Sequence, residues 1–242
     1  MRSWWREIAG LVLPVACGGC GRPRTELCEE CAGALAAVPR RVRPVPEPAG
    51  LPMVHAAAPY ENAVRATLLA HKERGALGLA GALGGALAAA VRAGAGHVGD
   101  AGPLLLVPVP SSPRATAARG HDPARRIALA AAAALRRGGV AARVLAVLGQ
   151  RRAVADQAGL KAGERHANLA GALAVADGGR RLLQGARIVL VDDVLTTGSS
   201  LAEAARAVRA VRGADRADGS TAEPLRAAVV AASPSAFELN RN

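Results

Sequence analysis

Two adjacent carboxylates, Asp192 and Asp193, directly follow a run of four aliphatic residues at 188–191. Such a run predicts a buried strand of a parallel sheet, with the carboxylates where the strand emerges. The turn that follows contains hydroxyl side chains and one glycine: Thr196, Thr197, Gly198, Ser199 and Ser200. A helical pattern begins there, and hydroxyls beside the N–H groups of a helix start can bind a phosphate. Carboxylates next to that phosphate would bind sugar hydroxyls, so the motif predicts a sugar-phosphate site.

Rival explanations fit this motif less well. Two solvated aspartates and an ordinary helix cap would explain Ser199 or Ser200, but not adjacent carboxylates after a buried strand. The magnesium-binding strand of a nucleotide hydrolase would require a Gly-Lys phosphate loop, and the chain contains no Gly-Lys pair. The glycine string at 94–99 matches a dinucleotide fingerprint, but it follows a helical stretch, so it predicts a loop that ends a helix.

The cysteines form two CxxC pairs, Cys17 with Cys20 and Cys28 with Cys31. Two such turns can present four thiolates tetrahedrally to zinc. Disulfides or unliganded thiols are the alternatives, and a reducing compartment favours zinc over them. Four thiolates leave no open position for a substrate, so the predicted zinc is structural.

The composition favours anionic partners. The 242 residues carry a formal net charge of +12, from 31 basic and 19 acidic side chains. This charge suits phosphate esters, pyrophosphate or nucleic acid, without choosing among them. Aromatic residues make up only 2% of the chain, so a base-stacking groove for single strands is not expected. Any DNA contact would be electrostatic and would weaken steeply with salt.

The chain divides into three predicted parts. Residues 1–38 form the zinc-binding module, 39–50 a proline-rich linker and 51–242 an α/β domain. Strands are expected at 53–58, 104–109, 143–148, 188–191 and 226–232. Helices are expected at 61–71, 77–91, 123–137 and 164–169, and after residue 200.

Two apolar stretches raise the question of a membrane. At the chain start, Glu7 and Pro14 interrupt a pattern that would otherwise suggest a signal peptide, so a docking helix is predicted there. The uncharged run at 75–91 is short for a membrane span and predicts a buried helix. We therefore expect a cytoplasmic protein without membrane insertion.

The opening motif resembles a known signature. The string VLVDDVLTTGSS, residues 189–200, is similar to the phosphoribosyl-pyrophosphate signature of type I phosphoribosyltransferases. The resemblance implies that family's α/β fold, a parallel sheet flanked by helices. It also implies that residues 196–200 hold the 5′-phosphate of phosphoribosyl pyrophosphate. Asp192 and Asp193 would accept hydrogen bonds from the ribose hydroxyls, directly or through Mg²⁺.

Other segments resemble the ComF family, a competence-associated group of phosphoribosyltransferase-like proteins linked to DNA uptake and recombination. They are the paired CxxC motifs, ENAVRATLLAHKERG at 61–75, LVPVPSSPRATAARGHDPARRIALAAA from Leu106, and RRAVADQAGLKAGERHANLAGAL at 151–173. With the signature, they cover most of the chain from Cys17 to Val230 in family order. The chain departs from the family at RGHDP, residues 119–123, where an Asp-Pro pair predicts a helix start instead of ligand-binding side chains.

The resemblance also implies roles for individual residues. Arg119, with the Ser111-Ser112 turn, would bind the pyrophosphate, and Lys72 could reach the same group from the early helix. Two cations in the polar segment, Lys161 and Arg165, would close over the substrate and exclude water. For each of these four cations, an ordinary solvated surface charge is the alternative.

Two functions follow. In the first, the protein is an enzyme that transfers a phosphoribosyl group to an acceptor that the sequence does not identify. In the second, it binds phosphoribosyl pyrophosphate without catalysis, as a sensor or scaffold that engages DNA or a DNA-handling helicase. The donor motif is common to both.

Overall fold

The computed structural model describes residues 15–95, 102–152, 168–184, 186–213 and 224–240. Several predictions lie outside these ranges and are not tested. They concern the docking helix at the chain start, Lys161, Arg165 and most of the 164–169 helix.

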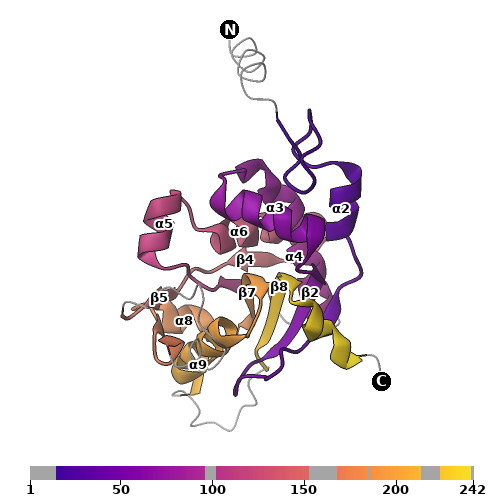
Figure 1. Ribbon diagram of the computed structural model, residues 1–242. Helices are drawn as coiled ribbons and strands as arrows, with labels where there is room; N and C mark the ends of the chain where they lie inside the picture. The colour runs from indigo at the N-terminus through magenta and orange to yellow at the C-terminus, as the bar shows by residue number, and fades with distance from the viewer. Residues whose placement is uncertain (1–14, 96–101, 153–167, 185, 214–223, 241–242) are drawn as a thin grey trace.

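A six-stranded sheet forms the centre of the molecule, with the order β1-β2-β8-β7-β3-β4 (Figure 1). Its strands are β1 (Arg40–Val42), β2 (Met53–Pro59), β8 (Arg226–Ala232), β7 (Arg187–Leu195), β3 (Leu104–Pro108) and β4 (Ala142–Val144). All neighbouring strands are parallel except β1, which pairs antiparallel with β2 at one edge. The carboxyl ends of the five parallel strands therefore meet along one edge of the sheet.

Helices cover both faces of the sheet (Figure 1). One face packs against α4 (Ala80–Ala95) and α6 (Pro123–Arg137), with α3 (Asn62–Glu73) and the 3-10 turn η1 (Leu77–Leu79) beside them. The other face packs against α9 (Ser199–Gly213), α8 (Gly179–Leu183) and a small antiparallel hairpin of β5 (Leu148–Gln150) and β6 (Leu173–Val175). The remaining elements are α2 (Glu29–Leu35), α5 (Pro113–Arg119) and η2 (Pro234–Asn240).

The core is built mainly from alanine, valine and leucine, as the low aromatic content predicts. Small residues allow the helices to approach closely. A Cβ added to Gly84 of α4 would lie 2.4 Å from the Cβ of Ala130 on α6, so only glycine fits at this crossing.

Helix α4 belongs to this core. Together with η1 it is the one helical stretch in the described ranges, Leu77–Ala95, that is long and apolar enough to cross a membrane. Half of that stretch is buried inside the protein, where α4 packs on α6, β8 and β2. This placement agrees with the predicted buried helix.

The α/β architecture with a mostly parallel sheet is confirmed, and so are the bounds of α6 and β8. Two predictions of strands were wrong. The expected strand at 143–148 is two strands, because β4 pairs with β3 while β5 pairs with β6 in a separate hairpin. The expected strand at 188–191 continues to Leu195, because β8 keeps pairing with β7 as far as that residue.

Candidate functional site

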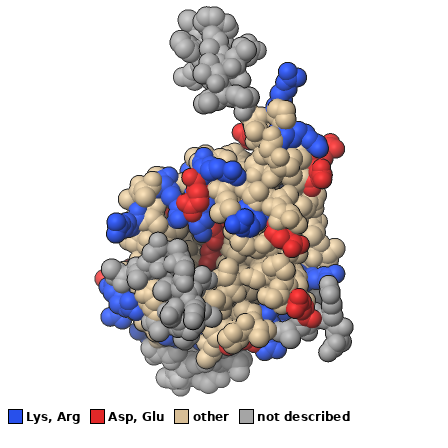
Figure 2. Space-filling model, in the orientation of Figure 1, with Lys and Arg blue, Asp and Glu red and all other residues tan. Residues whose placement is uncertain are grey.

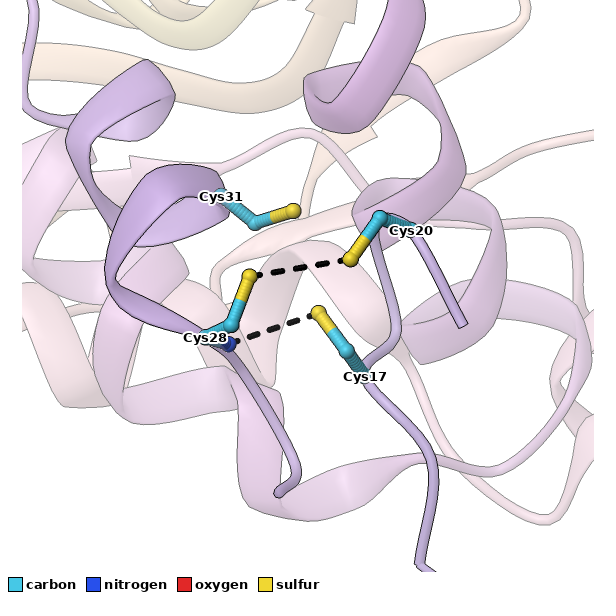
Figure 3. Close-up of side chains that lie close together, drawn as sticks. All are labelled: Cys17, Cys20, Cys28 and Cys31. Carbon is cyan, nitrogen blue, oxygen red and sulfur yellow. Dashed lines mark hydrogen bonds between the residues drawn. The ribbon is translucent and has the colours of Figure 1, made fainter. Parts of the chain in front are cut away.

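The four cysteine side chains point toward a common centre (Figure 3). Cys17 and Cys20 come from a turn, while Cys28 caps the start of α2 and Cys31 lies in its first turn. All four sulfur atoms lie within 4.8 Å of one another, and the Sγ atoms of Cys20 and Cys28 are 3.6 Å apart. Four thiolates about 2.3 Å from a tetrahedral zinc would lie about 3.8 Å apart. The cluster can therefore hold a metal ion such as zinc.

The surroundings of the cluster favour a thiolate at Cys17 and a protonated thiol at Cys31. The cysteines form no disulfide. Burial alone would raise the pKa of Cys17, but backbone N–H groups of Cys20, Cys28 and Gly19 lower it to about 6, and the N–H of Cys28 lies 3.4 Å from the Cys17 sulfur. Burial raises the pKa of Cys31. A Cβ on Gly19 would lie only 2.6 Å from the Cys31 sulfur, so glycine is required in this turn.

A second site lies at the carboxyl edge of the sheet, where an open cavity of about 1270 Å³ is found. Eight of the residues predicted as ligand-binding line this cavity: Lys72, Ser111, Ser112, Arg119, Asp192, Asp193, Thr196 and Ser200. The structure thus brings together three segments that are far apart in the sequence. Lys161 and Arg165 lie outside the described residues.

The position of Asp192 follows from unequal strand lengths. Strand β3 pairs with β7 only as far as Val191, whereas β8 pairs with β7 as far as Leu195. Beyond Val191, the β3 side of β7 is therefore open to the cavity. Burial and the adjacent Asp193 carboxylate raise the pKa of Asp192 well above its usual range. A cation or a hydrogen-bond donor is needed to keep both carboxylates charged.

Lys72 supplies such a charge at the end of α3. Its Nζ donates to Oδ2 of Asp193 at 2.6 Å, and the two residues are 121 positions apart. Burial alone would lower the pKa of Lys72, but the attraction of Asp193 outweighs it and raises the pKa above the usual value. The Lys72–Asp193 pair connects α3 directly to β7.

The predicted phosphate loop forms the turn between β7 and α9. Gly198 has φ +76°, a conformation that favours glycine, and α9 begins at the next residue. The hydroxyls of Thr197 and Ser199 lie 3.1 Å apart. A small cavity of about 30 Å³ is lined by Asp192 and residues 194–201. The first N–H groups of α9 have no partners within the helix, so this turn can bind an anion.

The segment after β3 forms the opposite wall. Ser112 caps α5 by accepting a hydrogen bond from the N–H of Ala115 at 3.1 Å, while the N–H of Ser111 donates to Asp122 at 3.4 Å. Asp122 caps α6, as its Asp-Pro sequence predicts. Arg119, the last residue of α5, forms two hydrogen bonds of 2.8 Å with the carboxylate of Glu73.

Several residues of the cavity are not predicted by any sequence motif. An apolar wall is formed by Tyr60, Leu68 and Leu69, from the end of β2 and from α3. Four further polar residues are Arg114, Gln150, Arg151 and Arg152. One signal could have identified Tyr60, because it directly follows a predicted strand, as the carboxylate pair follows its own strand.

The charge distribution agrees with an anion site. Figure 2 shows Lys and Arg side chains on both sides of acidic side chains across the upper half of this face. Five cations line the cavity: Lys72, Arg114, Arg119, Arg151 and Arg152. Two acidic residues, Asp192 and Asp193, line it as well. Cations thus outnumber carboxylates around the opening, which favours a ligand with several negative charges.

No protein-family model matches the chain, and no curated protein matches it. Both sites consist of side chains whose chemistry is well defined, thiolates in one and paired carboxylates with cations in the other.

Proposed function

We propose that the cavity binds phosphoribosyl pyrophosphate with Mg²⁺ and that the protein, a type I phosphoribosyltransferase-like member of the ComF family, transfers the phosphoribosyl group to an acceptor. One observation carries the proposal. A carboxylate pair, a helix-start phosphate loop and a basic segment, distant in sequence, line one cavity at the carboxyl edge of a parallel sheet. These are the groups that a ribose, a 5′-phosphate and a pyrophosphate require.

The topology of the sheet supports this use of the cavity. From β3 the chain proceeds outward to β4, whereas from β7 it proceeds in the opposite direction to β8. The connections after the adjacent strands β3 and β7 therefore diverge and leave a crevice between them. Open α/β sheets bind ligands at such a crevice.

In this proposal, each part of the cavity lining binds a different part of the substrates. The turn at 196–200 holds the 5′-phosphate, and Asp192 and Asp193 bind the ribose hydroxyls. Arg119 and Lys72 bind the pyrophosphate, beside the Ser111-Ser112 turn. The apolar wall of Tyr60, Leu68 and Leu69 is the part of the lining left for the acceptor.

Asp192 and Asp193 are the residues that would hold Mg²⁺. Their fit follows from the raised pKa of Asp192, since a divalent cation would keep this pair, of which Asp193 is buried, ionised. When bound, Mg²⁺ would neutralise charge on the leaving pyrophosphate. In the reaction, the bond between ribose C1 and a pyrophosphate oxygen breaks, and its electron pair leaves with the pyrophosphate. An acceptor atom forms the new bond to C1 and releases its proton.

A non-catalytic receptor is the second candidate, and one observation favours it. The turn of the cysteine cluster contacts α3, because a Cβ on Gly18 would lie 3.3 Å from the Cβ of Ala70 and one on Gly19 would lie 3.1 Å from Oγ1 of Thr67. The same helix carries Lys72 to Asp193. Ligand binding could thus alter the surface around the cysteine cluster, where DNA or a DNA-handling helicase would dock.

Thermal unfolding with phosphoribosyl pyrophosphate and Mg²⁺ tests the shared donor site. At a ligand concentration 100 times the Kd, we expect a stabilisation of about 2.7 kcal/mol, which raises the Tm by about 5–10 °C. The double variant Asp192→Asn, Asp193→Asn should lose this shift, while the exposed control Asp177→Asn should keep it. An unchanged shift in the double variant would contradict the assignment.

Pyrophosphate release distinguishes the two candidates. The wild-type protein, phosphoribosyl pyrophosphate and Mg²⁺ are incubated with a panel of purine, pyrimidine and other nitrogen bases. Release that depends on a base supports the transferase. Tight binding without release under every condition supports the receptor.

A further inference from the structure

The guanidinium of Arg119 is held by a carboxylate of the protein itself. Its Nε and Nη2 atoms donate to the two carboxylate oxygens of Glu73, each at 2.8 Å. The Arg119 side chain is 23% exposed and that of Glu73 is 44% exposed. Within the described ranges, Glu73 is the partner of this guanidinium and neither group has another.

A carboxylate and a phosphate compete for the same two donors of an arginine. Both accept two parallel N–H···O bonds from the guanidinium, so a pyrophosphate cannot use this face of Arg119 while Glu73 is bound to it. The ion pair is also partly open to solvent, which makes it weak enough to be exchanged.

The residue before Glu73 is engaged in the same way. Lys72 places a positive charge on Asp193, while Glu73 places a negative charge on Arg119. Two consecutive residues at the end of α3 thus place a positive side chain beside the carboxylate pair and a negative side chain beside Arg119. This is the charge pattern that a magnesium–pyrophosphate ligand would present.

We propose that Glu73 is a built-in competitor that occupies the pyrophosphate-binding fork of Arg119 until the ligand displaces it. The inference rests on the proposed function, which assigns Arg119 to pyrophosphate. The competition sets a minimum strength with which an anion must bind Arg119 before it can replace Glu73. A weakly bound anion such as inorganic phosphate fails to displace Glu73, whereas pyrophosphate, with more charge and more acceptor oxygens, succeeds.

Titration calorimetry with inorganic pyrophosphate and Mg²⁺ tests the competition. Glu73→Gln keeps the size of the side chain but removes its charge, so the variant should bind pyrophosphate about three- to tenfold more tightly than the wild type. Arg119→Gln should bind it more weakly. In the Arg119→Gln background, adding Glu73→Gln should change the affinity for pyrophosphate little, because the guanidinium for which Glu73 and pyrophosphate compete is gone. Glu61→Gln, an exposed carboxylate at the other end of α3, is the matched control and should bind as the wild type.

The outcomes separate this inference from the proposed function. If Arg119→Gln weakens binding but Glu73→Gln leaves it equal or weaker, Glu73 is no competitor and only this inference fails. An equal gain from Glu73→Gln in both backgrounds also overturns it, because the effect would then be general charge repulsion. If Arg119→Gln binds as tightly as the wild type, or the wild type does not bind, the pyrophosphate assignment fails together with the inference.

Discussion

The cysteine cluster and the ligand cavity are assembled in opposite ways. The cluster draws all its side chains from residues 17–31, through one turn and the start of α2. The cavity draws on the ends of β2, β3 and β7, on the β5–β6 hairpin and on α3 and α5, and its closest ion pair joins residues 121 positions apart. The first arrangement depends on local spacing, whereas the second requires the whole sheet to form.

The two sites also differ in how their polar groups are satisfied. The four thiols are gathered around a centre that a metal ion fits, and their own contacts are few and long, at 3.4 and 3.6 Å. In the cavity, Lys72 pairs with Asp193 and Arg119 pairs with Glu73 at 2.6–2.8 Å. The cavity can therefore form without its ligand, while the stability of the cluster should depend on its metal.

Helix α3 connects the two sites. Its Thr67 and Ala70 face the glycines of the cysteine turn, and its last turn carries Lys72 and Glu73 to the cavity. A change confined to one site can therefore reach the other through this helix.

Removing the metal ligands should have the largest effect. In the double variant Cys28→Ser, Cys31→Ser, two of four thiolates are lost, so the protein should no longer retain zinc and its Tm should fall by about 10 °C or more. Metal analysis should find one zinc per wild-type chain. Hydrogen exchange should show faster exchange at 15–38 and in α3, with the strands of the sheet still protected.

The matched control is Ala32→Ser, which adds a serine to α2 without replacing a ligand. It should retain zinc and change the Tm little. Wild-type protein that contains no metal would contradict the predicted zinc site. If the amides of residues 15–38 exchanged equally slowly in the wild type and the double variant, the cysteine cluster would not depend on its metal for stability. The contrast with the cavity, which can form without its ligand, would then be lost.

Much of the fold could be predicted because its signals are local. Helix α6 begins at Pro123, directly after its cap Asp122, and ends before two glycines, so both of its bounds follow from neighbouring residues. Strand β8 is an apolar run with clear limits. The hairpin could not be predicted, because β5 pairs with β6 across more than twenty intervening residues. Nothing within 143–150 shows that the chain changes sheets there.

The residues of the cavity also divide into those that local sequence predicts and those that it does not. Asp192, Asp193, Thr196 and Ser200 belong to one continuous motif, which is why their placement in a single cavity could be anticipated, while Thr197, Gly198 and Ser199 line the small cavity beside it. Glu73 and Tyr60 carry no such motif. Tyr60 lines the cavity, and Glu73 reaches Arg119 of its wall, because α3 crosses the carboxyl edge of the sheet from the end of β2 toward Asp193. This crossing is set by packing of α3 against α2, η1 and the cysteine turn.

His71 offers a test of α3 that is independent of metal and ligand. It is fully buried, packs edge-on against His121 with ring centroids 5.5 Å apart, and neither of its ring nitrogens has a hydrogen-bond partner within the described ranges. Burial, together with His121, Arg126 and Lys72, lowers its pKa to about 4, although the Asp193 carboxylate opposes them. The folded protein therefore keeps His71 neutral at a pH where the unfolded chain protonates it.

Stability should consequently fall as the pH drops from about 6.5 toward about 4, where the unfolded state binds the extra proton. At about pH 5 this should cost about 2 kcal/mol of unfolding free energy, relative to about pH 7.5. His71→Leu should remove that loss. Urea unfolding of both proteins at the two pH values measures it, and an identical acid dependence in the variant would show that His71 is charged or exposed in the folded state.

The smallest effect is expected at the wall of the cavity opposite α3, where α9 holds the β5–β6 hairpin. Glu203 is buried, accepts a hydrogen bond from the N–H of Leu173 at 3.0 Å and pairs with Arg206, which also donates to the carbonyl of Leu173. Although burial would raise the pKa of Glu203, the Arg206 guanidinium and the backbone donors lower it. The charged carboxylate therefore fastens β6, and through it β5, to α9.

Glu203→Gln weakens these charge-assisted bonds, so it should reduce the unfolding free energy by about 1–2 kcal/mol. Amide exchange should therefore quicken in the hairpin before it does in the six-stranded sheet. The change would reach the cavity lining, because β5 carries Gln150 and leads into Arg151 and Arg152. Glu29→Gln, an exposed carboxylate on α2, should leave both measurements unchanged. If exchange in the hairpin stayed slow in Glu203→Gln, β5 and β6 would be held by apolar packing alone, and this wall of the cavity would be preformed as firmly as the sheet.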